Sequence, residues 1–461
     1  MSPGVDMIKE PMISVGVTSM KSAVDFRLIG RFEANGRMKL PQGEYTARLD
    51  GGRISILSRD GGMIIRDSSI GLLPELPGKN RFVLRKVRIG GGFHWEQRQD
   101  LTFQGEFHIR SFDEEHLQVI NRLPLEAYLS GVIGSEMSGT APFEFLKAHA
   151  VISRSWALRR IDRKAEPALS GSSHVEPTDK EYILRWTGAE IHRGFDVCAD
   201  DHCQRYRGIL GESASNPERA VQETWGEVLA HENEICDTRY SKCCGGMTEN
   251  FRTAWDDRDI PYLTGLPDND RFPPEFSYPL TDEENAQAWI TGSPEAYCNS
   301  KNRELLETVL SQLDWRTRDF FRWQKVYSQK EISDIVAEKA GSNLGRIRDL
   351  LALERGASGR IIRLAIVGTA RTITVGKELE IRRVLSPTHL YSSAFVSQRE
   401  DERDEIPRSF RLIGAGWGHG VGLCQIGAAV MATQGRTYRE LLRHYFPGTS
   451  LRKYHRNGQV R

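Results

Sequence analysis

Short alternating runs of apolar and polar residues dominate the first 120 residues, and this pattern restricts them to β-structure. The alternation is clear in Met12–Val17, Arg53–Leu57 and Glu106–Arg110. It gives each run one face for a core and one for solvent. Glycine pairs such as 51–52 separate the runs and mark turns between strands. We therefore expect a β-rich N-terminal module over residues 1–120.

The pattern changes at Leu123, where apolar residues begin to recur every three or four positions. This period predicts a helix from Pro124, because proline is favoured in the first turn of a helix. A second helix is predicted from about Ala141 to Trp156. Glu136 then falls in the short connection between the two helices, where rigid elements position a side chain that is open to a cleft.

Helical and strand patterns are mixed over residues 269–400, which we interpret as an insertion. Thr281–Glu284 has the pattern of a helix capping box, as does Thr437–Glu440 near the end of the sequence. We predict an α+β fold with an N-terminal β module, an α+β core that is split between residues 121–268 and 401–461, and the helical insertion between its two parts.

Charge and hydropathy exclude some classes of protein. Lysine and arginine number 63 against 62 for aspartate and glutamate, a net charge of +1, whereas nucleic-acid binding needs a local excess of positive charge. No apolar run approaches the ~18 residues of a transmembrane helix. The first residues show no basic stretch before an apolar core, so no signal peptide is visible. We expect no nucleic-acid partner and no transmembrane segment.

The seven cysteines are odd in number and too few for a disulfide framework in a chain of 461 residues. We expect reduced thiols, with one group holding a metal. His192, Cys198, His202 and Cys203 place four ligands within a short stretch, and this is the ligand set of a tetrahedral zinc site. A site with four protein ligands is closed and structural. A reduced surface cluster and a Cys198–Cys203 disulfide are the alternatives.

Two long motifs carry a family resemblance. The first runs from Leu123 as LPLEAYLSGVIGSEM and continues from Leu146 as LKAHAVISRSW; the second runs from Gly414 as GAGWGHGVGLCQIGA, followed from His444 by HYFPGT. Both resemble the stage II sporulation protein D and amidase-enhancer (SpoIID/LytB) domain family. The sequence departs from the family pattern where Gln, Tyr and Ser are common; here His149, Trp156 and Cys424 stand at these positions.

The resemblance implies a lytic transglycosylase, which cleaves the bond between N-acetylmuramic acid and N-acetylglucosamine in peptidoglycan. The sugar's own C6 hydroxyl attacks and leaves a 1,6-anhydro end. This chemistry needs one carboxyl group, whose pKa must be raised toward neutrality so that it can act as acid and then as base. Glu136 aligns with the catalytic glutamate of the family. Glu126 and Glu144 lie in first helical turns, where carboxylates complement the helix dipole, and we assign them structural roles.

The resemblance also implies residues that bind substrate. Arg154 matches a basic residue of the family's cleft, although a surface arginine is the alternative. Trp417 is a candidate platform for sugar stacking and His419 a candidate hydrogen-bond partner, with buried packing as the alternative for both. The remaining candidates are Tyr240 and Ser241, in a turn that shapes the groove, and Gln425. Some family members also carry a zinc knuckle, as proposed here for residues 192–203.

Two other functions are considered. A non-enzymatic protein of the amidase-enhancer type would bind glycan strands and stimulate a cell-wall amidase. A hydrolase acting on another polysaccharide would need a second carboxylate. We expect peptidoglycan glycan strands as the substrate, an amidase as a candidate partner, and the cell envelope as the compartment.

Overall fold

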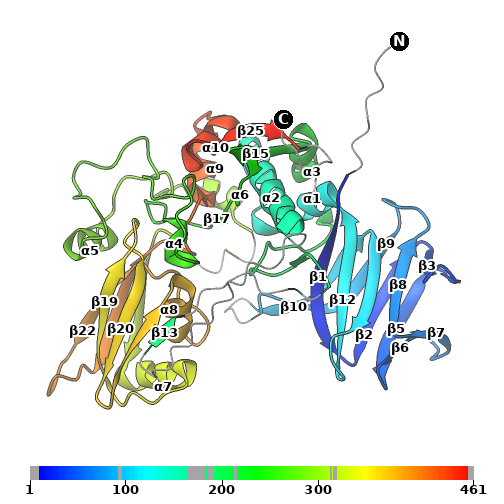
Figure 1. Cartoon of the computed structure of the whole chain (residues 1–461), viewed down its shortest axis with the longest axis horizontal. Helices are drawn as coiled ribbons and strands as arrows, with labels where there is room; N and C mark the ends of the chain where they lie inside the picture. Colours follow the sequence, from blue (N-terminus) through cyan, green and yellow to red (C-terminus); the bar gives the residue numbers. More distant parts are fainter. Residues whose placement is uncertain are drawn as a thin grey trace, which may run out of the picture. The chain divides into compact units, whose positions relative to one another are not determined.

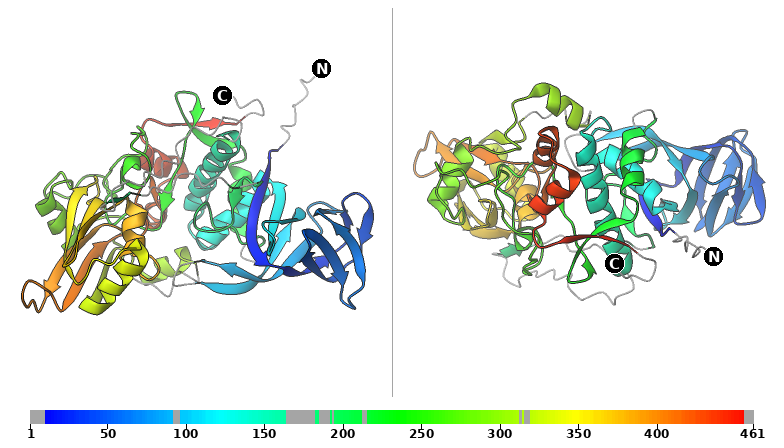
Figure 2. Two further views of the ribbon diagram at one scale, coloured as in Figure 1. Left: turned by 60° about the horizontal axis from the view of Figure 1, so that its bottom comes forward. Right: turned by 90° about the horizontal axis from the view of Figure 1, so that it is seen from above.

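The computed structural model describes residues 10–91, 96–163, 182–184, 192, 194–211, 215–311, 314 and 319–454. The chain divides into two compact units (Figures 1 and 2). The first unit is made of Met1–Pro167, Ile191–Asp237 and Ser450–Arg461; the second is made of Ala168–Glu190 and Thr238–Thr449. These boundaries differ from those of the four segments predicted from the sequence, and each unit is described by itself.

Two sheets form a sandwich in the first unit (Figure 1, blue to cyan). One sheet has the strand order β14 (Val197–Cys198), β1 (Met12–Lys21), β12 (His116–Pro124), β11 (Glu106–Ser111), β8 (Ser69–Pro74), β3 (Phe32–Ala34) and β4 (Met38–Leu40). The other has the order β10 (Gln97–Gln104), β9 (Arg81–Ile89), β2 (Ala23–Ile29), β5 (Gly43–Asp50), β6 (Arg53–Ser58) and β7 (Met63–Asp67).

Aromatic side chains join the two sheets. Phe107 of one sheet lies 5.0 Å from Phe26 and 4.6 Å from Phe82 of the other, measured between ring centroids. All three are fully buried, and such ring pairs add about 0.5–1.5 kcal/mol beyond the burial of their area. The alternating runs predicted as strands lie in β1, β6 and β11, because alternation suits a sheet with one buried face.

Three helices and a small sheet complete the first unit. They are α1 (Leu125–Glu136), α2 (Phe143–Arg163) and α3 (Ser215–Glu223), with β15 (Glu227–His231), β16 (Glu234–Ile235) and β25 (Ser450–Lys453). Pro124 is the N-cap residue of α1 and makes no side-chain capping hydrogen bond, so the helix predicted from Pro124 begins one residue later. Glu136 is the last residue of α1 rather than a residue of the following connection, a difference of one position.

Two larger sheets lie in the described part of the second unit, besides the two-stranded sheet of β17 (Tyr240–Ser241) and β24 (Leu423–Cys424). One has the order β13 (Tyr182–Leu184), β21 (Thr372–Gly376), β20 (Ile361–Gly368) and β19 (Ile347–Arg355). The other has the order β18 (Arg322–Ser328), β23 (Ser409–Ala415) and β22 (Phe395–Glu400). Apolar residues of these strands share a core with α7 (Gln329–Ala340) and α8 (Glu378–Val384). The predicted insertion therefore contributes strands as well as helices.

The remaining helices of the second unit are α4 (Phe251–Ala254), α5 (Glu283–Thr291), α6 (Arg303–Val309), α9 (Gln425–Thr433) and α10 (Tyr438–Tyr445). The capping box predicted at Thr437 is present on α10. The one predicted at Thr281 is wrong by one residue, because Asp282 caps α5 and accepts hydrogen bonds from the backbone of Glu284 and Asn285. No helix in the described part of the chain is both long and apolar enough to cross a membrane.

Candidate functional site

Glu136 lies at the C-terminal end of α1, with its side chain 8% exposed. The backbone N–H of Arg205 donates a hydrogen bond of 2.9 Å to Glu136 Oε1. The helix end disfavours negative charge on a nearby carboxylate, whereas a hydrogen bond from a backbone N–H favours it. Glu136 is thus a nearly buried carboxyl group that accepts a hydrogen bond from the Arg205 N–H.

The loop that carries Arg205 packs along α1. Tyr128 of α1 donates a hydrogen bond of 3.2 Å from its hydroxyl to Gln204 Oε1. The backbone N–H of Arg207 donates one of 3.1 Å to Ser135 Oγ. These contacts on both sides of Arg205 fix the position of its N–H relative to Glu136.

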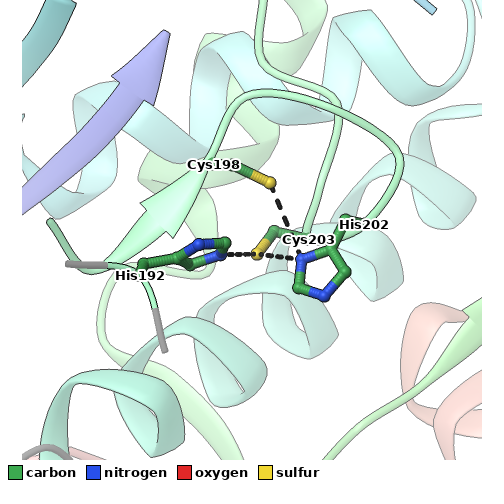
Figure 3. A group of neighbouring side chains, drawn as sticks. All are labelled: His192, Cys198, His202 and Cys203. Atoms are coloured by element: carbon green, nitrogen blue, oxygen red, sulfur yellow. Dashed lines mark hydrogen bonds between the residues drawn. The ribbon is translucent and has the colours of Figure 1, made fainter. Parts of the chain in front are cut away.

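The four predicted metal ligands converge at the start of this loop (Figure 3). His192 Nε2 lies 3.1 Å from Cys203 Sγ, and His202 Nδ1 lies 3.5 Å from Cys203 Sγ and 3.8 Å from Cys198 Sγ. All four ligand atoms lie within 4.8 Å of one another. A hydrogen bond with Cys203 is the main cause, and burial the second, that raises the pKa of the Cys198 thiol to about 11. A bound cation would favour the ionised form of both thiols. The group is able to hold a metal ion.

This cluster is linked to Glu136 through the chain itself. Cys203 lies two residues before Arg205, whose backbone N–H holds the carboxyl group. The guanidinium of Arg205 also donates from Nε to Asp201 Oδ1 at 2.5 Å, within the same loop. A metal that fixed His202 and Cys203 would therefore fix the donor to Glu136 as well.

Arg154 is almost fully buried, at 1% exposure. Its guanidinium donates to both carboxylate oxygens of Glu126, at 2.8 and 2.6 Å. It also donates to the carbonyl oxygen of Glu227, at 2.9 Å. These contacts join α2 to α1 and β15, so Arg154 and Glu126 together have a structural role. The predicted contact of Arg154 with substrate stays a prediction that this geometry does not require.

The other predicted substrate residues lie in the second unit, where the turn that begins at Tyr240 meets the segment that begins at Gly414. Strand β17 (Tyr240–Ser241) pairs in parallel with β24 (Leu423–Cys424), and the backbones of Cys243 and Trp417 exchange two hydrogen bonds, at 2.7 and 3.2 Å. Ser241 is buried, and its Oγ has no hydrogen-bond partner within the residues that the structure describes. Gln425 is buried at the start of α9.

Trp417 and His419 are packed by other aromatic residues. Trp417 stacks on Tyr391 with ring centroids 4.4 Å apart, and His419 meets Trp255 edge-on at 4.8 Å. His419 Nδ1 accepts a hydrogen bond of 3.0 Å from the backbone N–H of Val421. Burial, aided by Arg239 and Arg360, lowers the pKa of His419 well below its usual range. His419 is thus a neutral imidazole with its Nδ1 acceptor in use.

Glycines make the close approach of these segments feasible. Gly416, Gly418, Gly420 and Gly422 all have φ between 73° and 87°, in the left-handed region that glycine adopts readily. A Cβ at Gly422 would lie 2.2 Å from the carbonyl oxygen of Arg239. Any larger residue there would separate the strand pair β17–β24 and displace Ser241.

Sequence reasoning missed one group of residues. Cys244, Asp268, Cys298 and Cys424 converge in the second unit, with ligand atoms within 4.8 Å of one another. Their spacing along the chain is too long for any local motif. The signal that the sequence did contain was Cys424, which stands where the family commonly has Ser.

Comparisons with known proteins agree with the motifs. A sequence model of the family described as Stage II sporulation protein (SpoIID) matches residues 113–231, and the described units carry the two motifs of that family. The predicted resemblance is confirmed, because residues 113–231 match the SpoIID family model. A domain of unknown function (DUF8618) matches residues 249–422.

Similar proteins extend the likeness along most of the chain. Stage II sporulation protein D of Bacillus subtilis is 22% identical, over 72% of this chain and 76% of its own. The amidase enhancer of the same species is 22% identical, over 71% of this chain and 40% of its own. An uncharacterized protein of Brachyspira hyodysenteriae is 23% identical, over 96% of this chain and 94% of its own.

Proposed function

We propose that this protein is a peptidoglycan lytic transglycosylase in which Glu136 is the acid and base. The observation that carries the proposal is the carboxyl group at the end of α1, nearly buried and bound through Oε1 to the Arg205 N–H. It lies inside the segment matched by the SpoIID family. The names of the relatives, a stage II sporulation protein and an amidase enhancer, support a role related to the bacterial cell wall.

The reaction needs one proton donor that later becomes an acceptor. Glu136 first gives its proton to the glycosidic oxygen, which leaves as the 4-hydroxyl of N-acetylglucosamine. The C6 hydroxyl of the muramyl residue then bonds to C1, and its proton passes to Glu136. No water is consumed and the carboxyl group is regenerated. A hydrolase would instead add water across the bond and needs a second carboxylate.

The metal group supports the same proposal. We propose zinc as the ion at His192, Cys198, His202 and Cys203, because a Cys2His2 set is the usual ligand set of a structural zinc site. All four ligands come from the protein, so the ion has no open position for substrate or water. Its role would be to hold the loop that carries the Arg205 N–H.

Substrate contacts are proposed for the second unit. Ser241 supports this, because a buried hydroxyl without a partner is uncommon in proteins and a sugar hydroxyl would supply one. The strand pair β17–β24 contains or adjoins the other candidates, which are Tyr240, Gln425, Trp417 and His419. Two of them, Trp417 and His419, also have packing partners. We leave Arg154 out of the proposed contacts, because its guanidinium holds the fold of the first unit.

A second candidate is a non-enzymatic modulator that binds glycan and stimulates a cell-wall amidase. The amidase enhancer among the relatives is the observation that favours it. Either role acts on the cell wall, so we propose the cell envelope as the compartment and an amidase as a candidate partner.

The products formed from purified, peptide-free glycan strands separate these functions. A transglycosylase releases fragments that end in 1,6-anhydro-muramic acid. A hydrolase releases fragments heavier by one water, and a binding protein releases none. Mass spectrometry of the soluble products therefore tests the proposal, and the absence of anhydro ends would reject it.

A further inference from the structure

Three cysteines and an aspartate from distant parts of the second unit meet in its interior. Cys244 follows β17, Asp268 and Cys298 lie in loops, and Cys424 ends β24. All four are buried, with exposures between 0 and 3%. One ligand atom of each lies within 4.8 Å of the ligand atoms of the other three. Four coordinating groups thus converge where a core would otherwise hold apolar side chains.

The distances fit a single metal ion better than a covalent bond. Cys244 Sγ and Cys298 Sγ are 3.7 Å apart. Two thiolates on one tetrahedral zinc, each at ~2.3 Å, are separated by ~3.8 Å, whereas sulfurs in a disulfide are ~2.05 Å apart. In a [4Fe–4S] cluster each thiolate binds a different iron atom, so its thiolates stand further apart than these two.

Hydrogen bonds already orient the candidate ligands. The backbone N–H of Cys244 donates to Cys424 Sγ at 3.3 Å. Asp268 Oδ1 accepts from the Tyr445 hydroxyl at 2.5 Å, and its Oδ2 accepts from the Cys298 N–H at 2.8 Å. Donors of this kind fix the ligands of metal sites and are part of how such sites are built.

Charges around the cluster also favour bound thiolates. Arg360 is fully buried and donates from Nη1 to the carbonyl oxygen of Cys244 at 3.1 Å. Arg322 donates to the carbonyl oxygen of Gly245 at 3.1 Å. A zinc ion with three thiolates and one carboxylate has a net charge of about −2, and two guanidinium groups would offset it.

We propose that Cys244, Cys298, Cys424 and Asp268 bind one zinc ion, in a closed structural site separate from the His192–Cys203 group. Zinc suits the set because thiolate and carboxylate ligands in a tetrahedral arrangement are typical of it. Binding replaces the thiol protons, which pass to solvent. The ion would tie the strand pair β17–β24 to the loops of Asp268 and Cys298, and so hold Ser241 in place.

Metal analysis of freshly purified, reduced protein tests the site. We expect two equivalents of zinc per chain in the parent protein. Cys298→Ser should lower this to one, Cys198→Ser should also leave one, and the double variant should leave none. Cys236→Ser is the matched control, because Cys236 is a buried cysteine in the first unit and should leave both equivalents.

A second measurement covers the case in which Cys298→Ser does not fold. The Cys198→Ser variant, with zinc replaced by cobalt, should show strong thiolate-to-cobalt absorption of a tetrahedral site. The proposal would be wrong if the Cys198→Ser variant contained no zinc and showed no thiolate-to-cobalt band. A Cys244–Cys298 disulfide found by peptide mapping of native protein would also overturn it. If zinc is lost in Cys298→Ser but unchanged in Cys198→Ser, the site at Cys298 is supported and the His192–Cys203 site is rejected.

Discussion

At the scale of single residues, the contacts of a charged side chain show whether it has a structural role, as for Arg154 in the first unit. Arg154 resembles a cleft residue in sequence, yet its guanidinium is buried against Glu126. Sequence alone gives the residue type and its helix, because both belong to a long motif. It does not give the partner, because Glu126 lies 28 residues away and only the packing of α1 on α2 brings the two together.

Arg154→Met tests this structural role. Removing the cation leaves the Glu126 carboxylate buried without its partner, so the free energy of unfolding should fall by about 3–5 kcal/mol. Urea denaturation measures the change. Arg154→Met/Glu126→Leu is the control and should recover part of the loss, because it also removes the stranded charge. An unchanged stability together with a raised KM for glycan would instead place Arg154 in the substrate site.

His419 should make stability depend on pH. Its folded pKa is lowered by burial, so the unfolded chain takes up a proton near pH 6.5 while the folded chain does not. The free energy of unfolding is therefore highest above pH 6.5. It decreases as the pH falls below this value, by at most about 1.4 kcal/mol per pH unit. His419→Asn should flatten this part of the pH profile of Tm. A profile that is the same in both proteins between pH 6.5 and 5 would reject the assignment.

At the scale of elements, the sequence predicts well where one period covers many residues. Strands β1, β6 and β11, helices α1 and α2, and the capping box of α10 follow directly from local pattern. The strands of the second unit's β17–β24 pair are two residues long and have no period to detect. They form because glycines such as Gly422 let the segment before Ser241 and the segment before Cys424, which are distant in the sequence, approach each other closely.

Close packing of the loop that follows Cys203 on α1 gives an element-scale prediction. A Cβ at Gly131 would lie 2.7 Å from the carbonyl oxygen of Gly208 and 2.7 Å from the Tyr206 ring. Gly131→Ala should thus destabilise the protein by about 1–3 kcal/mol, despite the better helix propensity of alanine. Gly134→Ala is the control, because its close contact is the end of the flexible Leu210 side chain. Equal effects of both changes on urea denaturation would contradict the packing described.

Loss of the metal should loosen the same loop. Cys198→Ser removes one ligand of the His192–Cys203 group, so we expect a lower Tm and a lower rate of glycan cleavage, since the Arg205 N–H would no longer be held on Glu136. A chelator should have the same effect on the parent protein. Thermal denaturation and product release measure the two effects. A variant with unchanged Tm and rate would show that the loop is held without a metal.

Across the whole molecule, the two motifs of the family fall in different compact units. The first motif forms α1 and α2 of the first unit, and the second forms β24 and α9 of the second unit. The sequence predicts a core that is split along the chain, because the motifs are far apart. It cannot predict that residues 269–400 share a core with β23, because that depends on contacts between distant apolar positions.

Part of the candidate site could be predicted from the sequence, and part could not. Glu136 was predicted from the resemblance of its motif to the family, and the His192–Cys203 group from residue types and spacing. The Arg205 N–H could not be predicted, because a backbone donor has no sequence signature. The group formed by Cys244, Asp268, Cys298 and Cys424 was also beyond the sequence, because its members are separated by up to 180 residues, between Cys244 and Cys424. Only the folded second unit brings them together.

The rate of 1,6-anhydro product release by Glu136→Gln tests the central claim most directly. The amide is nearly isosteric, so stability should change by no more than about 1 kcal/mol while glycan binding is kept. Turnover on peptide-free strands should fall by at least ~100-fold, because one group serves both proton transfers. Glu144→Gln is the control, since Glu144 pairs with Lys147 in the first turn of α2 and should leave the rate nearly unchanged. Near-parental release of anhydro products by Glu136→Gln would contradict the account.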